Sequence, residues 1–306
     1  MINWIKTLAA TCTVALLAAC GGGDHKDNIV EIAQKDARFS ILAEAVVAAD
    51  LAGTLSGPAP LTVFAPTNDA FSALLAELGV TKAQLLADKT LLTQVLTYHV
   101  LPGAVTKAQV PAGKAITTAQ GGIFKVDAVG SGLVITDGRN RRSNIVATDI
   151  EAENGVLHVI DKVILPADKN IVQTALSVPA FSILVEAVVA ADLQGTLSGT
   201  GPFTVFAPTN DAFAALLTEL GVTKDQLLAD KALLTKVLTY HVVGARVLKA
   251  DVPVGTPIST LQGGTFTVTP ALAIQDQNGR SANIVATDTF ASNGVIHVID
   301  KVILPK

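Results

Sequence analysis

Aromatic side chains are scarce in this chain of 306 residues. It contains one Trp, two Tyr and ten Phe, and the single tryptophan is Trp4, near the amino terminus. Proteins that grip sugar rings or unstacked bases usually present exposed aromatic faces on which the ligand stacks. Tyr98 and Tyr240 leave little material for such a platform, so the composition argues against sugar stacking.

Basic side chains and cysteine are also few. Lys and Arg number 22 against 26 Asp and Glu, which gives a formal net charge of −4. A nucleic-acid-binding protein normally carries a basic footprint, so no nucleic acid is expected as a partner. The two cysteines are Cys12 and Cys20. If export removes the first and modifies the second, no internal disulfide forms and stability comes from packing.

The first 19 residues have the pattern of an export signal. Lys6 precedes apolar or small residues from Thr7 to Ala19, a run too short to span a bilayer. The run ends in "LAAC", whose cysteine is Cys20, and a glycine-rich stretch follows. This resembles the lipobox of bacterial lipoproteins, which implies cleavage before Cys20 and a diacylglycerol on its sulfur. The alternative is an ordinary secretion signal with an incidental cysteine.

The remainder of the chain consists of two copies of one sequence. "TVFAPTNDAF" occurs at 62–71 and again, unchanged, at 204–213, an offset of 142 residues. The offset falls to 139 between "NGVLHVIDKVILP" at 154–166 and its counterpart at 293–305. Three residues are therefore missing from the second copy, at a point equivalent to 123–144. A period near 140 residues is the length of a whole domain.

The repeat predicts five segments along the chain. They are a signal peptide at 1–19, a flexible tether at 20–27, a first domain at 28–166, a linker at 167–170 and a second domain at 171–306. A flexible tether of this length spans roughly 15 Å, which would keep the first domain close to a lipid surface. The linker is short and has no Gly, Ser or Pro run, so a limited range of domain orientations is expected.

Each copy is predicted to be α+β, with helices first and a mostly antiparallel sheet afterwards. Apolar residues recur at helical spacing up to Tyr98, and Asp27 is expected to cap the opening helix. Short β-rich runs separated by glycine-containing turns follow between 115 and 165.

The repeated decapeptide is predicted to specify the fold. Its proline stops a strand, the following Thr or Asn caps a helix, and its second Phe packs inward. Direct contact with a partner is the alternative. The residues given this fold-specifying role are Pro66, Thr67, Asn68 and Phe71, with Pro208, Thr209, Asn210 and Phe213 in the second copy.

Three motifs together resemble the signature segments of the fasciclin domain. They are the decapeptide, the internal "YH" pair and the terminal "NGVLHVIDKVILP", in the same order in both copies. The resemblance covers 28–166 and 170–305. It implies a β-sandwich or wedge with helices packed to one side, and a role in adhesion without a shared enzymatic activity.

In animal members of that family the Tyr-His segment has been linked to receptor binding. The resemblance therefore implies candidate partner-binding residues in both copies, which are Tyr98, His99, Tyr240 and His241. The alternative is structural: a histidine at a helix carboxyl terminus can bond a free carbonyl, and tyrosine can bury its ring.

No constellation for catalysis or metal binding is present. The chain has no G-x-S-x-G, no P-loop and no dinucleotide fingerprint. Each copy has two histidines without ligand spacing, and His158 and His297 are expected to be buried and hydrogen-bonded. We expect no catalytic residue, no metal and no cofactor, and therefore no enzyme. "DGRNRR" at 137–142 is predicted to be an exposed turn where the copies could differ in partner.

The expected function is non-catalytic adhesion or partner binding. The protein would be exported and lipid-anchored in the bacterial cell envelope, at the outer membrane, facing either the periplasm or the cell surface. Its partners would be the membrane, through the lipid, and an unknown protein or matrix component. The alternative is a periplasmic scaffold or accessory protein that holds another envelope component near the membrane.

Overall fold

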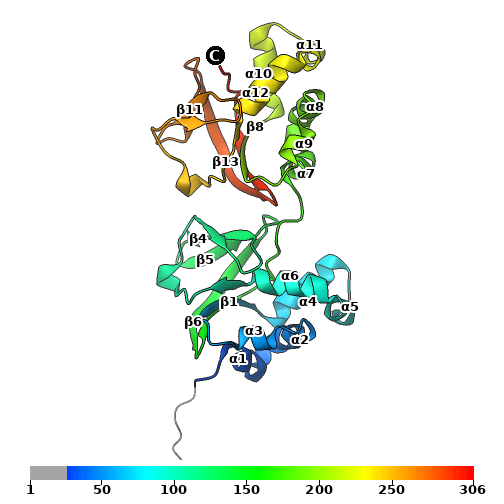
Figure 1. The fold of residues 1–306 in the computed structure, drawn as a ribbon, viewed down its shortest axis with the longest axis vertical. Coiled ribbons are helices and arrows are strands. Elements are labelled where there is room, and N and C mark those ends of the chain that lie inside the picture. Colours follow the sequence, from blue (N-terminus) through cyan, green and yellow to red (C-terminus); the bar gives the residue numbers. More distant parts are fainter. Residues whose placement is uncertain (1–25) are drawn as a thin grey trace, which may run out of the picture.

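Two α+β domains follow one another along the long axis of the molecule (Figure 1). The computed structural model describes residues 26–306, so the predicted signal peptide and Cys20 lie outside the described residues. The predicted α+β class and the tandem architecture are confirmed: each domain contains one seven-stranded sheet with helices packed to one side. The first helix lies at one end of the molecule and the carboxyl terminus at the other.

The helices of the first domain form two groups on the same side of the sheet (Figure 1). The first group is α1 (Ile29–Lys35), the 3₁₀ turn η1 (Ala37–Phe39), α2 (Ser40–Ala48) and α3 (Ala52–Leu55). The second group is α4 (Asn68–Leu78), α5 (Lys82–Ala87) and α6 (Lys89–Tyr98). Asn28, rather than the predicted Asp27, caps α1, because its side chain accepts from the amides of Val30 and Glu31.

The strands of the first domain are mostly antiparallel, as predicted. They are β1 (Leu61–Pro66), β2 (Val100–Pro102), β3 (Ala115–Thr117), β4 (Ile123–Val129), β5 (Gly132–Thr136), β6 (Arg142–Ala152) and β7 (Gly155–Ile160), with the 3₁₀ turn η2 (Lys107–Gln109) after β2. The sheet order is β2-β1-β7-β6-β5-β4-β3. The β1–β7 pair is parallel, which brings the two longest motifs of the repeat side by side.

The second domain repeats this plan. Its helical elements are α7 (Ile171–Leu176), η3 (Pro179–Phe181), α8 (Ser182–Ala190), α9 (Gln194–Leu197), α10 (Asn210–Leu220), α11 (Lys224–Ala229), α12 (Lys231–Tyr240) and η4 (Lys249–Asp251). Its strands are β8 (Phe203–Pro208), β9 (Val242–Val243), β10 (Ile258–Ser259), β11 (Thr265–Val268), β12 (Ala273–Gln275), β13 (Ser281–Ala291) and β14 (Gly294–Ile299). The sheet order is β10-β11-β12-β13-β14-β8-β9, which is the order of the first sheet read from its opposite edge.

The three-residue difference between the copies lies in one hairpin. In the first domain Val126 pairs with Ile135 across the β4–β5 hairpin, whereas the equivalent pair in the second domain is Val268 and Ile274. The "DGRNRR" turn itself has the same length in both copies. The copies therefore differ in chain length at the tip of a hairpin and differ only in residue type at the turn that follows.

The decapeptide joins strand, helix and core. Thr67 caps α4 by accepting from the amide of Ala70, and Phe71 is buried. The carboxamide of Asn68 accepts from the amide of Ile41 at 3.0 Å and donates to the carbonyl of Ala37 at 2.8 Å, so it ties α4 to the start of α2. Thr209 and Asn210 make the same cap and the same tie in the second domain. In both domains these contacts connect the helix after the decapeptide to the helix before it.

Candidate partner-binding groove

All four side chains of the predicted Tyr-His binding pairs are buried. Their exposed fractions are 0% for Tyr98, 2% for His99, 0% for Tyr240 and 1% for His241. Tyr98 closes α6 and His99 is its carboxyl-terminal cap, so the pair turns inward where the helix leads into β2. The folded domains thus offer a partner no surface at these residues.

The hydroxyl of Tyr98 bridges two backbone groups. It donates to the carbonyl of Ile123 at 2.5 Å and accepts from the amide of Gly138 at 2.8 Å. Burial raises the pKa of Tyr98 well above its ordinary value, so the hydroxyl keeps its proton. In the second domain Tyr240 donates to Thr265, and the amide of Gln277 reaches its hydroxyl at 3.3 Å.

His99 is held neutral by two backbone partners. Its Nδ1 lies 2.7 Å from the carbonyl of Val95, and the amide of Ile164 lies 3.1 Å from its Nε2. Nδ1 therefore donates and Nε2 accepts, which uses both nitrogens of the uncharged ring. Burial lowers the pKa of His99 to about 4, and the pKa of His241, in the same setting, also falls to about 4.

Asp137 is the second buried hub of this region. Its side chain is 1% exposed and accepts from the amides of Arg139, Arg141 and Leu165, while the guanidinium of Arg141 pairs with it at 3.0 Å. The prediction of an exposed "DGRNRR" turn is wrong for its first two residues, because Asp137 and Gly138 are both buried. An aspartate that accepts several backbone amides fixes a turn from inside.

Together these buried groups shape a groove on the surface of the first domain. Tyr98 and His99 fix the end of α6, and Asp137 fixes the segment that follows β7. Between these elements and α4 lies a cavity of about 420 Å³. Its walls are apolar side chains of α4, α5, α6 and the exit segment, which are Phe71, Leu74, Leu78, Leu85, Leu91, Leu92, Val95, Leu96 and Leu165. Its rim carries Gln94, Gln120, Arg139 and Asp168.

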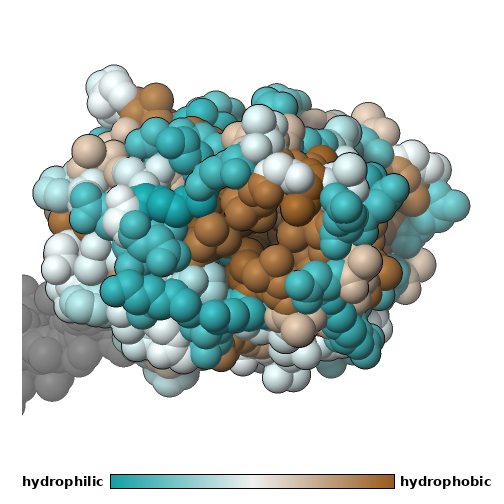
Figure 2. Space-filling view, turned by 90° about the horizontal axis from the view of Figure 1, so that it is seen from above, coloured by the Kyte–Doolittle hydropathy of each residue, from teal (hydrophilic) through white to brown (hydrophobic). Residues whose placement is uncertain are grey.

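The equivalent groove of the second domain faces outward. Figure 2 looks onto the end of the molecule that carries α10, α11 and α12, and shows an apolar hollow there with hydrophilic residues around it. Leu220 and Leu233, the counterparts of Leu78 and Leu91, are 45% and 37% exposed. Lys236 stands where the first groove has Gln94. An exposed apolar hollow with a polar rim is typical of an interaction site.

The two strand histidines serve the fold. The Nδ1 atom of His158 accepts from the amide of Asp149 and its Nε2 donates to the carbonyl of Val105, and His297 makes the equivalent bonds with Asp288 and Val247. Within residues 26–306 no group of three or more His, Cys, Asp or Glu is placed to hold a metal ion. Over the same residues, no helix has the length and apolarity that crossing a membrane requires.

Sequence comparison connects this architecture to known proteins. The chain is 31% identical over 253 residues to transforming growth factor-beta-induced protein ig-h3 of Sus scrofa, which covers 82% of the chain and 35% of that protein. It is 28% identical over 287 residues to human periostin, covering 92% of the chain and 32% of that protein. The chain thus spans about a third of these vertebrate relatives.

A bacterial relative and a solved structure are also similar to this chain. Protein sll1483 of Synechocystis is 45% identical over 147 residues, which is 47% of this chain and 76% of that protein. A FAS1 domain pair from the insect cell adhesion molecule fasciclin I aligns with 87% of this chain and 92% of its own, at a TM-score of 0.43 and 19% identity.

The family assignment rests on both halves of the chain. The family model described as Fasciclin domain matches residues 37–166 and again residues 179–305, one match in each structural domain. The fasciclin-domain homologues of this chain are adhesion-related, generally non-enzymatic proteins that are secreted or extracellular. Because the two matches cover most of the chain, this protein belongs to the fasciclin domain family.

Proposed function

We propose that this protein is a lipid-anchored, non-catalytic adhesion protein of the bacterial envelope that binds a protein partner through the groove of its second domain. The observation that carries the proposal is the apolar hollow at the end of the molecule opposite α1 (Figures 1 and 2). An anchor on Cys20 would hold the first domain near the membrane, and the second groove would then face away from it.

The expected occupant is a cluster of apolar side chains on a protein. A few apolar anchors seated in a desolvated hollow supply most of the binding energy in protein interfaces. Leu220 and Leu233 offer such a seat, whereas the Tyr-His pairs are closed inside the fold. At the outer groove Leu220 is 45% exposed, against 38% for its counterpart Leu78 in the first domain.

Substitution of the groove leucines tests this site. Leu220→Asp and Leu233→Asp are expected to weaken capture of the partner by about tenfold or more, because a carboxylate replaces an apolar contact. Cross-linked pull-down from native envelope, quantified for each variant, measures the effect. Val189→Asp is the matched control, since Val189 is 53% exposed on α8, outside this groove. Equal losses in control and groove variants would contradict the proposal.

The anchor is tested separately at Cys20. Replacing this residue by Ala removes the sulfur that would carry the lipid, so we expect the protein to leave the membrane fraction and to lose the mass of the diacylglycerol. Fractionation of cells and intact-mass spectrometry measure the two outcomes. A Cys20→Ala protein that keeps both its membrane association and its mass would show that the anchor lies elsewhere.

A further inference from the structure

The two domains meet through a small apolar cluster. Ile123 of the first domain packs with Leu248, Phe290 and Val295 of the second, and Ala115 packs against the same cluster. None of the four main members is more than 8% exposed. This contact lies where the upper face of the first domain meets the lower face of the second (Figure 1).

Two polar contacts frame the cluster. The ammonium of Lys125 lies 2.9 Å from a carboxylate oxygen of Asp288, and the two side chains are only 14% and 2% exposed. The carboxamide of Asn140 pairs with the backbone of Phe290, donating to its carbonyl at 3.0 Å and accepting from its amide at 2.6 Å. The junction therefore combines an apolar centre with directional bonds, as specific interfaces do.

Two residues of the 137–142 turn also contact the segment that leaves the first domain. Gly138 lies so close to the chain leaving the first domain that a Cβ there would stand 2.3 Å from the amide nitrogen of Ala167. Arg139 pairs with Asp168 of the same segment at 3.3 Å. The second copy carries Gln277 and Asn278 at these two positions.

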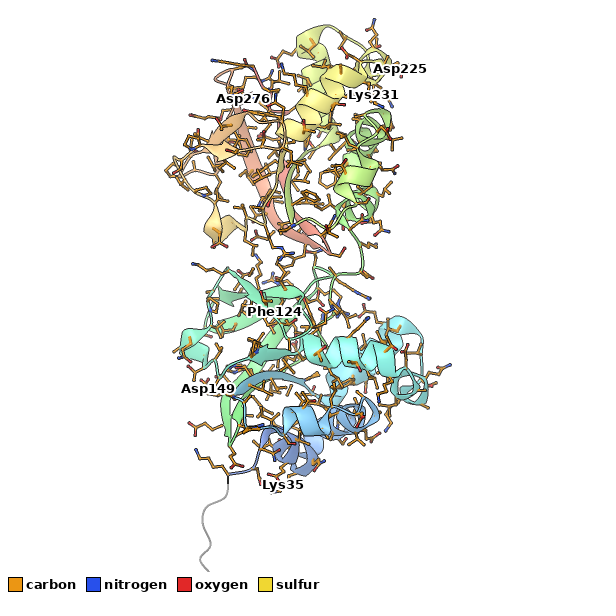
Figure 3. All side chains as sticks on the ribbon, viewed as in Figure 1. Lys35, Phe124, Asp149, Asp225, Lys231 and Asp276 are labelled. Atoms are coloured by element: carbon orange, nitrogen blue, oxygen red, sulfur yellow. The ribbon has the colours of Figure 1, made fainter. Side chains whose placement is uncertain are left out.

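Because the domains are copies, each junction face occurs a second time in the molecule. The upper face, which carries Ile123, Lys125 and Asn140 at the junction, recurs at the outer end of the second domain. The lower face, which carries Leu248, Asp288 and Phe290 at the junction, recurs at the base of the first domain. Figure 3 shows Asp149, the counterpart of Asp288, on the first domain away from the second. If these two end faces still matched each other, one molecule could dock onto the next, and such a head-to-tail contact does not close.

On the outer face of the second domain, every specific group of the junction is replaced. Thr265 stands for Ile123, Thr267 for Lys125 and Gly279 for Asn140. The face has thus lost its apolar centre, its cation and its backbone-pairing amide, while Tyr240 and Phe266 beneath it repeat Tyr98 and Phe124. The fold under the face is the same, and the chemistry of the face is different.

The base of the first domain is altered in the same way. Thr106 occupies the place of Leu248 and Glu151 the place of Phe290, although Asp149 and Val156, the counterparts of Asp288 and Val295, are retained. Glu151 is exposed and pairs with Lys26 at 2.8 Å. Docking a second molecule here would bury this carboxylate against Thr265 and would leave Asp149 opposite Thr267, which has no charge to offer.

We propose that the junction is a specific recognition surface between the two domains, and that the residue differences at the two end faces prevent the same surfaces from joining one molecule to another. The two faces of the junction fit each other. The outer face of the second domain does not fit the base of the first domain. A tandem built by duplication thereby remains a closed pair instead of growing into a filament, in the way that polar terminal repeats cap a repeat array.

Two complementary variants test this proposal. The upper-face variant carries Thr265→Ile, Thr267→Lys and Gly279→Asn; the last position has φ +76°, close to the 63° that Asn140 already adopts. The lower-face variant carries Thr106→Leu and Glu151→Phe. Each variant alone is expected to be monomeric, and their mixture is expected to form a one-to-one dimer. Within one molecule, a short covalent connection gives the two domains an effective concentration of about 1 mM. Sedimentation of the separate variants should therefore extend to about this concentration.

The outcomes distinguish specific recognition from non-specific hydrophobic association. A mixture that stays monomeric, with both variants folded by circular dichroism, overturns the proposal, and so does a wild-type protein that already associates head to tail. Self-association of the lower-face variant alone as strong as in the mixture also overturns it, because the two introduced apolar side chains would then act without a specific face.

A second measurement keeps the test decisive if a variant fails to fold. The double substitution Leu248→Thr and Phe290→Glu introduces into the junction the residue types found at the base of the first domain. The two domains are then expected to separate. Small-angle scattering should show an increased radius of gyration, and cleavage in the linker at 167–170 should be about tenfold faster. Scattering and cleavage equal to those of the wild type would refute a specific junction.

Discussion

Asp137→Ala is expected to lower the free energy of unfolding of the first domain by about 3–5 kcal/mol, the cost of removing one partner from a buried ion pair. The carboxylate is 1% exposed, and the guanidinium of Arg141 would keep its position with only Glu77 and the carbonyl of Val163 as partners. The amides of Arg139 and Leu165 would also lose their acceptor. The groove wall at Leu165 would then lose its attachment to the turn.

Urea unfolding followed by circular dichroism measures this loss. Asp127→Ala provides the control. Asp127 is 35% exposed and pairs with Lys125 at 3.3 Å. A solvent-exposed pair of this kind contributes at most about 1 kcal/mol. Asp276→Ala should cost the second domain less than Asp137→Ala costs the first, because Arg280 lies 3.9 Å from that carboxylate. If Asp137→Ala cost no more than Asp127→Ala, the turn would not depend on the carboxylate.

Stability is expected to fall between pH 6.5 and about pH 4. In that window the unfolded chain protonates His99 and His241, whereas the folded protein holds both neutral, with the pKa of each lowered to about 4. The unfolded state therefore binds more protons, and the free energy of unfolding decreases as the pH falls. The contribution of each histidine is fully present above pH 6.5 and amounts to roughly 3 kcal/mol.

Unfolding measured at pH 7 and at pH 4.5 checks this dependence. His99→Gln retains a donor and an acceptor without a titrating ring, so the pH dependence of the first domain should weaken even if its stability at pH 7 changes. His241→Gln should do the same in the second domain. An unaltered slope in both variants would mean that other groups govern the acid response, and burial also lowers the pKa of His297.

The fold was largely predictable because local signals agreed with one another. Strand, proline stop and helix cap follow within four residues at Ala65–Asn68, and Gly79 ends α4 in the left-handed conformation that glycine favours. The error at the first helix was one residue. Asn28 and Asp27 are both good caps, and Glu31 selects Asn28 by completing the capping box.

The site was less predictable, because burial depends on contacts between distant segments. "Tyr-His" at a helix end is compatible with exposure or with burial, and what decides is that Ile123, Gly138 and Ile164 supply backbone partners. Similarly, a turn rich in Arg looks exposed until Asp137 is seen to accept amides from the exit segment. Neither set of partners follows from local spacing.

The groove had a signal in the sequence that periodicity alone could not interpret. Leu78 lies on the apolar stripe of α4 and its counterpart Leu220 on that of α10, and such stripes normally face the core. Both residues nevertheless remain more than a third exposed. An apolar stripe that continues past the core leaves a surface for something else to cover.

The proposed groove is tested most directly by photo-cross-linking in intact cells from a benzophenone amino acid placed at position 220, compared with the same group at position 189. We expect a defined protein adduct from position 220 in the groove, and none from position 189 on α8. Adducts from position 189 without any from position 220 would contradict the claim that the outer groove of the second domain is where this fasciclin-domain protein holds its partner.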